Sequence, residues 1–246
     1  MTGGKLKTRI TIVVSLMSVF AALDVALSAL PGWWISWAAI IKPLYGIMLG
    51  PVAGPCAAII GGIIGNFIWP HTAVLAVFTW VPGILGALAS GIIVKGGKSH
   101  LWMFVLIVHA VLISAFYLHP VGNTVALWAL YDKVIALALI FPTVKMVKKS
   151  RISEGESLDV KWLLPALALT SFIGTEADDI TGNVIFMYLE LYKLFGIPPE
   201  ALPPLYVAGA VIMPLQRVLV AIIATLVAVP LFKAFEKSAL IRWPLT

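Results

Sequence analysis

The sequence predicts an all-α protein, a polytopic bundle of about six to eight helices in a membrane with both termini in the cytoplasm. Three observations predict this class. Hydrophobic residues make up 61% of the chain and charged residues 11%, and the mean hydropathy is +1.04, far from the composition of soluble domains. The apolar segments are long and numerous, so one bundle is expected rather than a soluble domain with an anchor. The basic residues gather on the segment ends of one side.

The apolar runs predict eight spans in a single integral membrane domain, residues 1–246, because a helix needs about 17–25 residues to cross a bilayer. The expected spans are 9–30, 36–50, 51–68, 74–95, 101–118, 121–145, 161–182 and 212–234. The first has no small-residue cleavage site and leads directly into further apolar segments, which favours a span over a cleaved signal. Gly50-Pro51 predicts a tight turn between the short second and third spans.

The distribution of basic residues predicts the orientation. The opposite loops, near 31–35, 69–73, 118–122 and 190–205, contain one basic residue, Lys193. By the positive-inside rule, both termini are then cytoplasmic, which agrees with an even number of crossings. The formal net charge of +6 therefore reflects topology, and the lipid bilayer, not nucleic acid, is the expected partner of this surface.

Polar and charged residues within the spans predict a binding site. A charge near the centre of a membrane helix costs about 2.5–3.5 kcal/mol, so each one needs a reason. Counted from the cytoplasmic ends at about 1.5 Å per residue, these side chains lie roughly 18–24 Å into a core about 30 Å thick. They come from five spans and converge on one level in the outer half of the membrane: Asp24, Asn66, Asp132, Lys133, Glu176 and Arg217.

The span 161–182 contributes most of the acidic residues. Glu176, Asp179 and Asn183 are spaced i, i+3 and i+7 and share one helical face, whereas Asp178 is expected to point elsewhere. A structural network is one interpretation, with Arg217 paired to Glu176 or Asp179 and Lys133 to Asp132 or Asp24. A proton or ion path is another. Because five acids face two bases in this layer, a substrate site is favoured, with Trp69 at its mouth.

Other motifs are missing from the sequence. It has no P-loop, no zinc motif and no Gly-x-Ser-x-Gly elbow. Cys56 is the only cysteine, so neither an intrachain disulfide nor a thiolate cluster is expected. We expect no catalytic residues, no metal, no cofactor and no enzyme activity. Two alternatives stay open: a proton- or sodium-coupled secondary transporter and, less favoured, a Mg²⁺-dependent intramembrane enzyme using Glu176, Asp178 and Asp179.

Three stretches resemble a known family. They are Leu49-Gly50-Pro51-Val52-Ala53-Gly54 followed by a glycine-rich segment ending at Asn66, Ala22-Leu23-Asp24-Val25-Ala26, and Pro214-Leu215-Gln216-Arg217 in the last span. These stretches are similar to those of the substrate-binding subunits (S components) of energy-coupling factor (ECF) transporters, which capture vitamins and related micronutrients. That family typically has six spans, whereas eight are expected here.

The resemblance implies a function and a set of partners. A vitamin-like amine or heterocycle would bind from outside, under the loops near 31–37, 69–73 and 196–206, in the plasma membrane of a prokaryote. The implied partners are a transmembrane coupling subunit and two cytosolic ATPases, and the subunit would topple to release its cargo. The substrate-binding residues predicted from the polar layer itself are Asp24, Asn66, Trp69, Asp132, Lys133, Glu176, Asp179, Asn183 and Arg217. The implied docking residues are Ala22, Ala26, Gly50 and Gly54, the last two part of a ladder of small residues at Gly46, Gly50, Gly54, Ala58 and Gly62.

Overall fold

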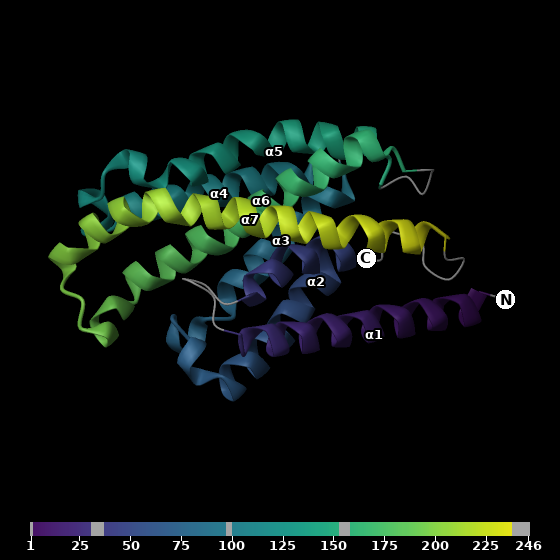
Figure 1. Ribbon diagram of the computed structural model, residues 1–246, viewed down its shortest axis with the longest axis horizontal. Helices are drawn as coiled ribbons and strands as arrows, with labels where there is room; N and C mark the ends of the chain where they lie inside the picture. Colours follow the sequence, from purple (N-terminus) through teal and green to yellow (C-terminus); the bar gives the residue numbers. More distant parts are fainter. Residues whose placement is uncertain (1, 31–36, 97–99, 153–157, 238–246) are drawn as a thin grey trace.

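The protein is a bundle of seven helices joined by short 3₁₀ turns (Figure 1) in the computed structural model, which describes residues 2–30, 37–96, 100–152 and 158–237. The helices are α1 (Thr2–Ser28), α2 (Ile41–Ile68), α3 (Val81–Lys95), α4 (Leu101–Leu118), α5 (Tyr131–Ser150), α6 (Val160–Tyr188) and α7 (Leu202–Lys237). The 3₁₀ turns are η1 (Trp37–Ile40), η2 (Pro70–Thr72), η3 (Ala76–Phe78), η4 (Gly122–Thr124), η5 (Leu127–Leu130), η6 (Leu191–Phe195) and η7 (Pro199–Ala201). The described residues contain no strand, so the predicted all-α class is confirmed.

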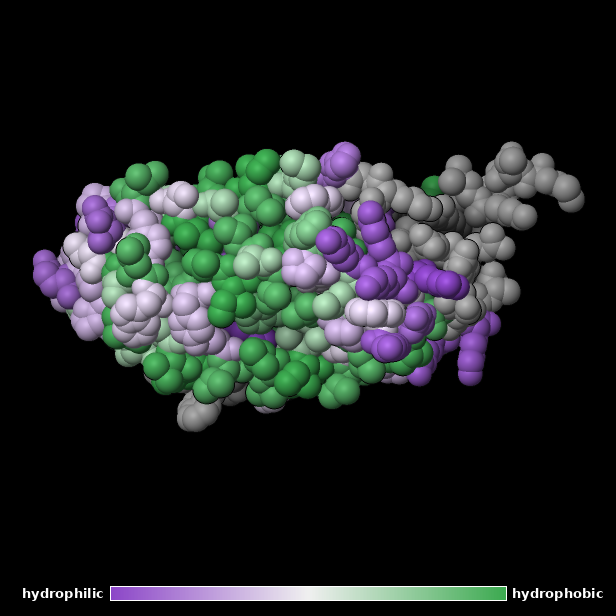
Figure 2. Space-filling model, turned by 90° about the horizontal axis from the view of Figure 1, so that it is seen from above, coloured by the Kyte–Doolittle hydropathy of each residue, from purple (hydrophilic) through white to green (hydrophobic). Residues whose placement is uncertain are grey.

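The surface and the helix lengths are those of a multi-pass membrane protein. Six helical stretches are long and apolar enough to cross a membrane: Ile10–Ser28, Trp37–Ile68, Ala76–Lys95, Leu101–Leu118, Leu127–Ser150 and Pro199–Phe235. The face seen in Figure 2 has a broad apolar belt between two hydrophilic ends. Helix α6 carries Glu176, Asp178 and Asp179 and is packed among α2, α3, α4, α5 and α7, so these charges lie inside the bundle and not on the belt.

The first helix begins and the last helix ends at the same end of the bundle. The start of α1 lies at the same end as the final turns of α7 (Figure 1), as an even number of passes requires. A dense cluster of hydrophilic residues gathers near that end in Figure 2. That this end faces the cytoplasm stays a prediction from the positive-inside rule.

Helix α2 is a hairpin of two helical arms, because its backbone is not helical at Gly50, where φ is 86° and ψ is −178°. A Cβ atom placed on Gly54 would lie 2.7 Å from the carbonyl oxygen of Tyr45, although residues nine apart in an unbroken helix are separated by about 13 Å. The chain therefore reverses at Gly50-Pro51, as predicted, and a positive φ favours glycine there. The ladder of small residues crosses this turn, so it does not form a single stripe.

Most predicted spans correspond to helices, and 101–118 has the predicted bounds. The start of 121–145 was wrong: η4 and η5 occupy residues 122–130, and α5 begins at Tyr131. Pro120, Gly122 and Asn123 explain this start, since all three residue types favour turns over helix.

Three further spans have different bounds from those predicted. Helix α6 extends beyond 182 to Tyr188, and the 74–95 span begins with η3 before α3 starts at Val81. Helix α7 begins ten residues before 212, so part of the expected outer loop is helical. Pro203 and Pro204 lie in its first turn, where a missing N–H leaves no hydrogen bond unmade. Residues 31–36, part of the outer loop expected above the substrate, lie outside the described residues.

The buried apolar residues form two clusters along the bundle. The larger cluster includes Leu44, Ile140 and Leu167, and the smaller one includes Phe116, Leu130 and Ile180. Five charged residues occur in the sequence between members of the two clusters: Asp132 and Lys133 between Leu130 and Ala136, Asp178 and Asp179 between Ala177 and Ile180, and Arg217 between Ala210 and Val220. A polar layer thus separates two apolar layers.

The packing of the hairpin against α3 predicts the effect of a single methyl group. A Cβ atom on Gly46 would lie 2.0 Å from the carbonyl oxygen of Ala87, so Gly46→Ala should force α2 and α3 apart and lower the free energy of unfolding by about 1–3 kcal/mol. The control is Gly209→Ala, where the new Cβ atom would meet only Met213 Cγ, at 3.7 Å. Equal denaturation midpoints for the two variants in detergent would contradict this packing.

Candidate functional site

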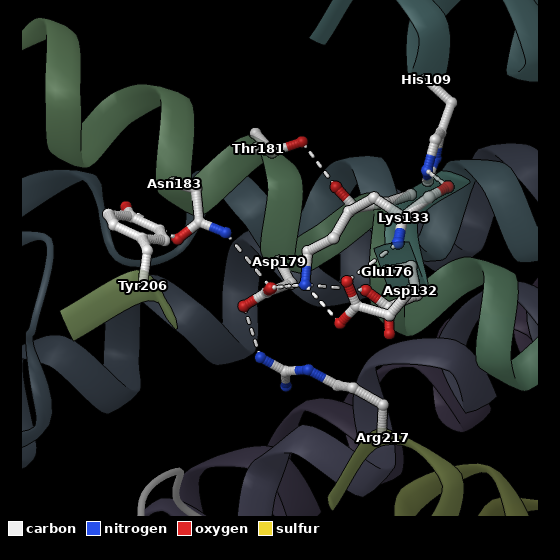
Figure 3. A network of polar contacts seen from close by, with 10 residues as sticks. His109, Asp132, Lys133, Glu176, Asp179, Thr181, Asn183, Tyr206 and Arg217 are labelled. Atoms are coloured by element: carbon white, nitrogen blue, oxygen red, sulfur yellow. Dashed lines mark hydrogen bonds and ion pairs between the residues drawn. The ribbon is translucent and has the colours of Figure 1, made fainter. Parts of the chain in front are cut away.

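Lys133 is the centre of a buried charge network (Figure 3). Its Nζ atom lies 2.7 Å from Asp132 Oδ2, 3.2 Å from Glu176 Oε2 and 2.6 Å from Asp179 Oδ2. An ammonium group has three protons to donate, so one lysine of α5 faces as many carboxylates as it has donors. Lys133 is only 3% exposed, and this network therefore joins α5 to α6 away from bulk solvent.

The first turn of α5 holds Asp132 and Lys133 in place. Asp132 lies in the first turn, where the partial positive charge of the helix N-terminus favours a carboxylate. Its Oδ1 atom accepts a hydrogen bond of 3.0 Å from the backbone N–H of Lys133. From α4, His109 Nε2 lies 3.1 Å from the carbonyl oxygen of Lys133. Contacts within α5 and from α4 thus fix the backbone of the lysine.

Asp179 connects the network to α7. Its Oδ1 atom accepts a hydrogen bond from the Arg217 guanidinium, and its Oδ2 atom lies 3.2 Å from Asn183 Nδ2. Tyr206 Oη donates in turn to Asn183 Oδ1 at 3.3 Å. Glu176, Asp179 and Asn183 do share one face of α6, as their spacing predicted, and Figure 3 shows the chain of contacts from Tyr206 to Arg217.

A second ion pair joins α1 to the hairpin. Lys42 Nζ lies 2.8 Å from Asp24 Oδ2 and 3.0 Å from Oδ1, and Tyr45 Oη donates to Asp24 Oδ2 at 2.9 Å. Gly61 makes room for this group, because a Cβ atom there would lie 2.9 Å from Asp24 Oδ2. Asp24 is therefore fully paired and 1% exposed.

A cavity of about 770 Å³ lies beside both groups of charges. Six of the predicted substrate residues line it: Asn66, Asp132, Lys133, Asp179, Asn183 and Arg217. The volume lies within the usual range of ligand pockets, about 300–1,000 Å³. His71, Thr72 and Ile197 from the connecting segments also line the cavity, so it reaches the end of the bundle opposite the start of α1.

The other three predicted substrate residues do not line the cavity. Asp24 lies behind Lys42, and Glu176 is fully buried beside Lys133. The indole N–H of Trp69 donates to the carbonyl oxygen of Val25 at 3.1 Å and so ties the end of α2 to α1. These three side chains support the cavity wall from behind, because each holds together the helices that form it.

Two residues that line the cavity were not predicted from the sequence to do so. The sequence left open whether Lys42 extends to the interface or reaches the pocket, and it lines the cavity, as does Asp178, which was expected to point elsewhere. Gly182 and Phe186 follow Asp178 at steps of four and line the same cavity. These three residues form a second row on α6 beside Asp179 and Asn183. This spacing is the sequence signal that could have predicted that two faces of α6 line the cavity.

The four predicted docking residues divide into two pairs. Gly50 and Gly54 are buried at the hairpin, where they pack against the protein's own backbone. Their closeness serves internal packing, which corrects the expectation that they face a partner. Ala22 and Ala26 are exposed on α1, which packs mainly against α2 and η1.

No arrangement for a metal ion occurs among the described His, Cys, Asp and Glu residues. The Lys133 ammonium lies within 3.2 Å of both Glu176 and Asp179. It therefore takes the position between these two carboxylates that the Mg²⁺ alternative requires.

The comparisons with known proteins give one distant relative. The chain is 25% identical over 203 residues to an uncharacterized protein of the archaeon Methanocaldococcus jannaschii, an alignment that covers 81% of this chain and 62% of the relative. The chain thus spans less than two thirds of the relative it matches. No protein-family model and no solved structure matches the sequence.

The central lysine predicts a large loss of stability on substitution. Lys133→Met leaves three carboxylates with Arg217 as their nearest cation, and removal of one partner from a buried ion pair costs about 3–5 kcal/mol. We expect the free energy of unfolding in detergent to fall by roughly this amount.

A matched control comes from Lys193, an exposed lysine just after α6. Its hydrogen bond to Glu190 lowers the pKa of that carboxyl group, but both side chains are more than half exposed, so Lys193→Met should leave unfolding unchanged. A wild-type denaturation midpoint for Lys133→Met would contradict the view that this network holds α5 to α6.

Proposed function

We propose that this protein is the membrane-embedded substrate-capture subunit of an ECF-type transporter, which takes up a vitamin-like small molecule through a pocket open to the outside. One observation carries the proposal: a cavity of about 770 Å³ inside an apolar bundle is lined by charged side chains from α2, α5, α6 and α7. A network of purely structural pairs needs no such hollow, since buried charges are best paired without a gap.

The lining of the cavity supports a small organic substrate. Ligand pockets combine apolar walls with a few placed polar groups. Leu75, Phe186 and Met213 supply apolar walls here, and Asn66 and Asn183 supply amide groups that donate and accept hydrogen bonds. A molecule of vitamin size with a heterocycle and an amine meets both kinds of surface.

In this proposal the remaining steps belong to partner proteins. Ala22 and Ala26 on the exposed face of α1 would contact a transmembrane coupling subunit, because small residues allow helices to approach closely in lipid. Two cytosolic ATPases would supply the energy, and the chain itself would not be an enzyme. The proposed location is the plasma membrane of a prokaryote, and the archaeal relative is compatible with it.

A cavity-filling substitution tests the capture function. Gly209 lines the cavity and has only Met213 Cγ within 4 Å of its missing Cβ atom, so Gly209→Phe should fill the space without displacing the backbone. We expect the purified wild type to retain a small molecule in native mass spectrometry and the variant to lose at least nine tenths of it.

The neighbouring residue provides the control. Ala208 lies on the exposed side of α7, and Ala208→Phe adds the same ring at the same depth outside the cavity. It should retain the molecule as the wild type does. Equal retention in Gly209→Phe, or no retained molecule in the wild type, would contradict capture in this cavity.

A proton- or sodium-coupled transporter is the second candidate, and Glu176 favours it. This carboxyl group is 0% exposed, and its Oε1 atom has no hydrogen-bond partner among the described residues, as expected of a group that takes up a proton. Liposomes that contain this chain alone would separate the two functions. Gradient-driven uptake would favour the coupled transporter, whereas binding without flux would favour the capture subunit.

A further inference from the structure

The polar layer carries more negative than positive charge. Its five carboxylates belong to Asp24, Asp132, Glu176, Asp178 and Asp179, and its three fixed cations belong to Lys42, Lys133 and Arg217. Protonation of the fully buried Glu176 would remove one of the excess charges. One negative charge then remains in a site surrounded by apolar helices, where an unmatched charge is costly.

Asp178 is the carboxylate without a partner. It forms no hydrogen bond and no ion pair with any described residue, while Asp24 and Asp179 hold Lys42 and Arg217 respectively. The Asp178 side chain nevertheless lines the cavity. Its negative charge is therefore directed toward a cavity that has room for another molecule.

The backbone around Asp178 is closely packed. A Cβ atom on Gly86 of α3 would lie 3.0 Å from the Cβ atom of Asp178 and 2.8 Å from the carbonyl oxygen of Gly174. Helices α3 and α6 thus touch at the level of Asp178, and its Cβ atom packs against α3. A carboxylate that forms no hydrogen bond or ion pair with the described residues and lines a cavity can receive a positively charged group there.

The apolar part of the cavity wall indicates an organic cation and not a metal ion. Leu75, Pro82 and Phe186 line the same cavity, and an aromatic ring also attracts organic cations through its face. A bare Mg²⁺ or Ca²⁺ ion needs about six or more oxygen ligands, and the described residues offer no such group.

We infer that Asp178 binds the positively charged group of an organic monocation, such as a primary amine or a protonated heterocycle, and so sets the charge selectivity of the cavity. The inference rests on the proposed function, since it assigns a partner to the substrate within the same cavity. Asp179 is not equivalent to its neighbour, because Lys133 and Arg217 already satisfy it.

Probes of one shape and different charge test this assignment. We would measure the dissociation constants of 2-phenylethylamine, 2-phenylethanol and 3-phenylpropionate for the purified full-length chain in detergent. The wild type should bind the amine at least tenfold more tightly than the alcohol or the acid. Asp178→Asn, which keeps the shape and removes the charge, should lose this preference while its affinity for the alcohol stays unchanged.

Three further variants separate the possible failures. Glu190→Gln removes a carboxylate beyond the end of α6 and outside the cavity, and it should behave as the wild type. Asp178→Glu keeps the charge and should keep the preference for the amine, which provides a readout if the asparagine variant folds poorly. Gly209→Phe should weaken the binding of every probe.

The inference is overturned if the wild type does not prefer the amine, or if Asp178→Asn keeps the preference. Loss of binding in Gly209→Phe together with either result would leave the capture function standing and remove only the role of Asp178. Unchanged binding of all three probes in Gly209→Phe would instead remove the proposed function itself.

Discussion

The pairing of charged side chains inside an apolar bundle is the constraint on which the arrangement of this protein depends. Each ionised group near the middle of a membrane helix costs about 2.5–3.5 kcal/mol unless it is matched. Lys133 matches three carboxylates at once, and Arg217 shares one of them, Asp179. Because these side chains come from α5, α6 and α7, the pairing also decides how the three helices lie against one another. Asp132, Lys133, Asp179 and Arg217 also line the cavity on one side of this network.

The hairpin α2 supplies the cation that pairs with the buried carboxylate of α1, Asp24. Its close approach to α3 depends on glycine at position 46, and the reversal at Gly50 returns the chain to the same level of the bundle. Lys42, on the arm before this reversal, meets Asp24 on α1. Small residues in this protein thus bring backbones together so that long charged side chains can meet, which is a use of glycine common in membrane helices.

Composition and hydropathy were sufficient to predict the all-α membrane class, and most spans were placed within a few residues. The starts of α5 and α7 could not be placed in this way, because 3₁₀ turns and proline-rich first turns are as apolar as the helices they precede. The depth of Asp132, Lys133 and Arg217 predicted their meeting, since the rise per residue in a helix is constant. The depth of Lys42 in the membrane could not be predicted, because the arm of α2 before Gly50 is short and has no cytoplasmic basic residue from which to count residues. Asp178 was misplaced because a wide cavity accepts two stripes of one helix, and its width depends on the packing of other helices.

The central claim is that the cavity is a wet chamber open to the outer face of the membrane. Accessibility of a single thiol tests it most directly. Gly182 lines the cavity, and a Cβ atom there makes only ordinary contacts, 3.5 Å from Leu75 Cδ1 and 3.6 Å from Pro82 Cγ. In a Cys56→Ala background, which removes the exposed natural thiol, Gly182→Cys should react with a membrane-impermeant thiol reagent added outside intact cells. Ala208→Cys, on the exposed side of α7 and expected to face lipid, should not. A Gly182→Cys thiol that reacts only after the membrane is permeabilised, or not at all, would contradict the account.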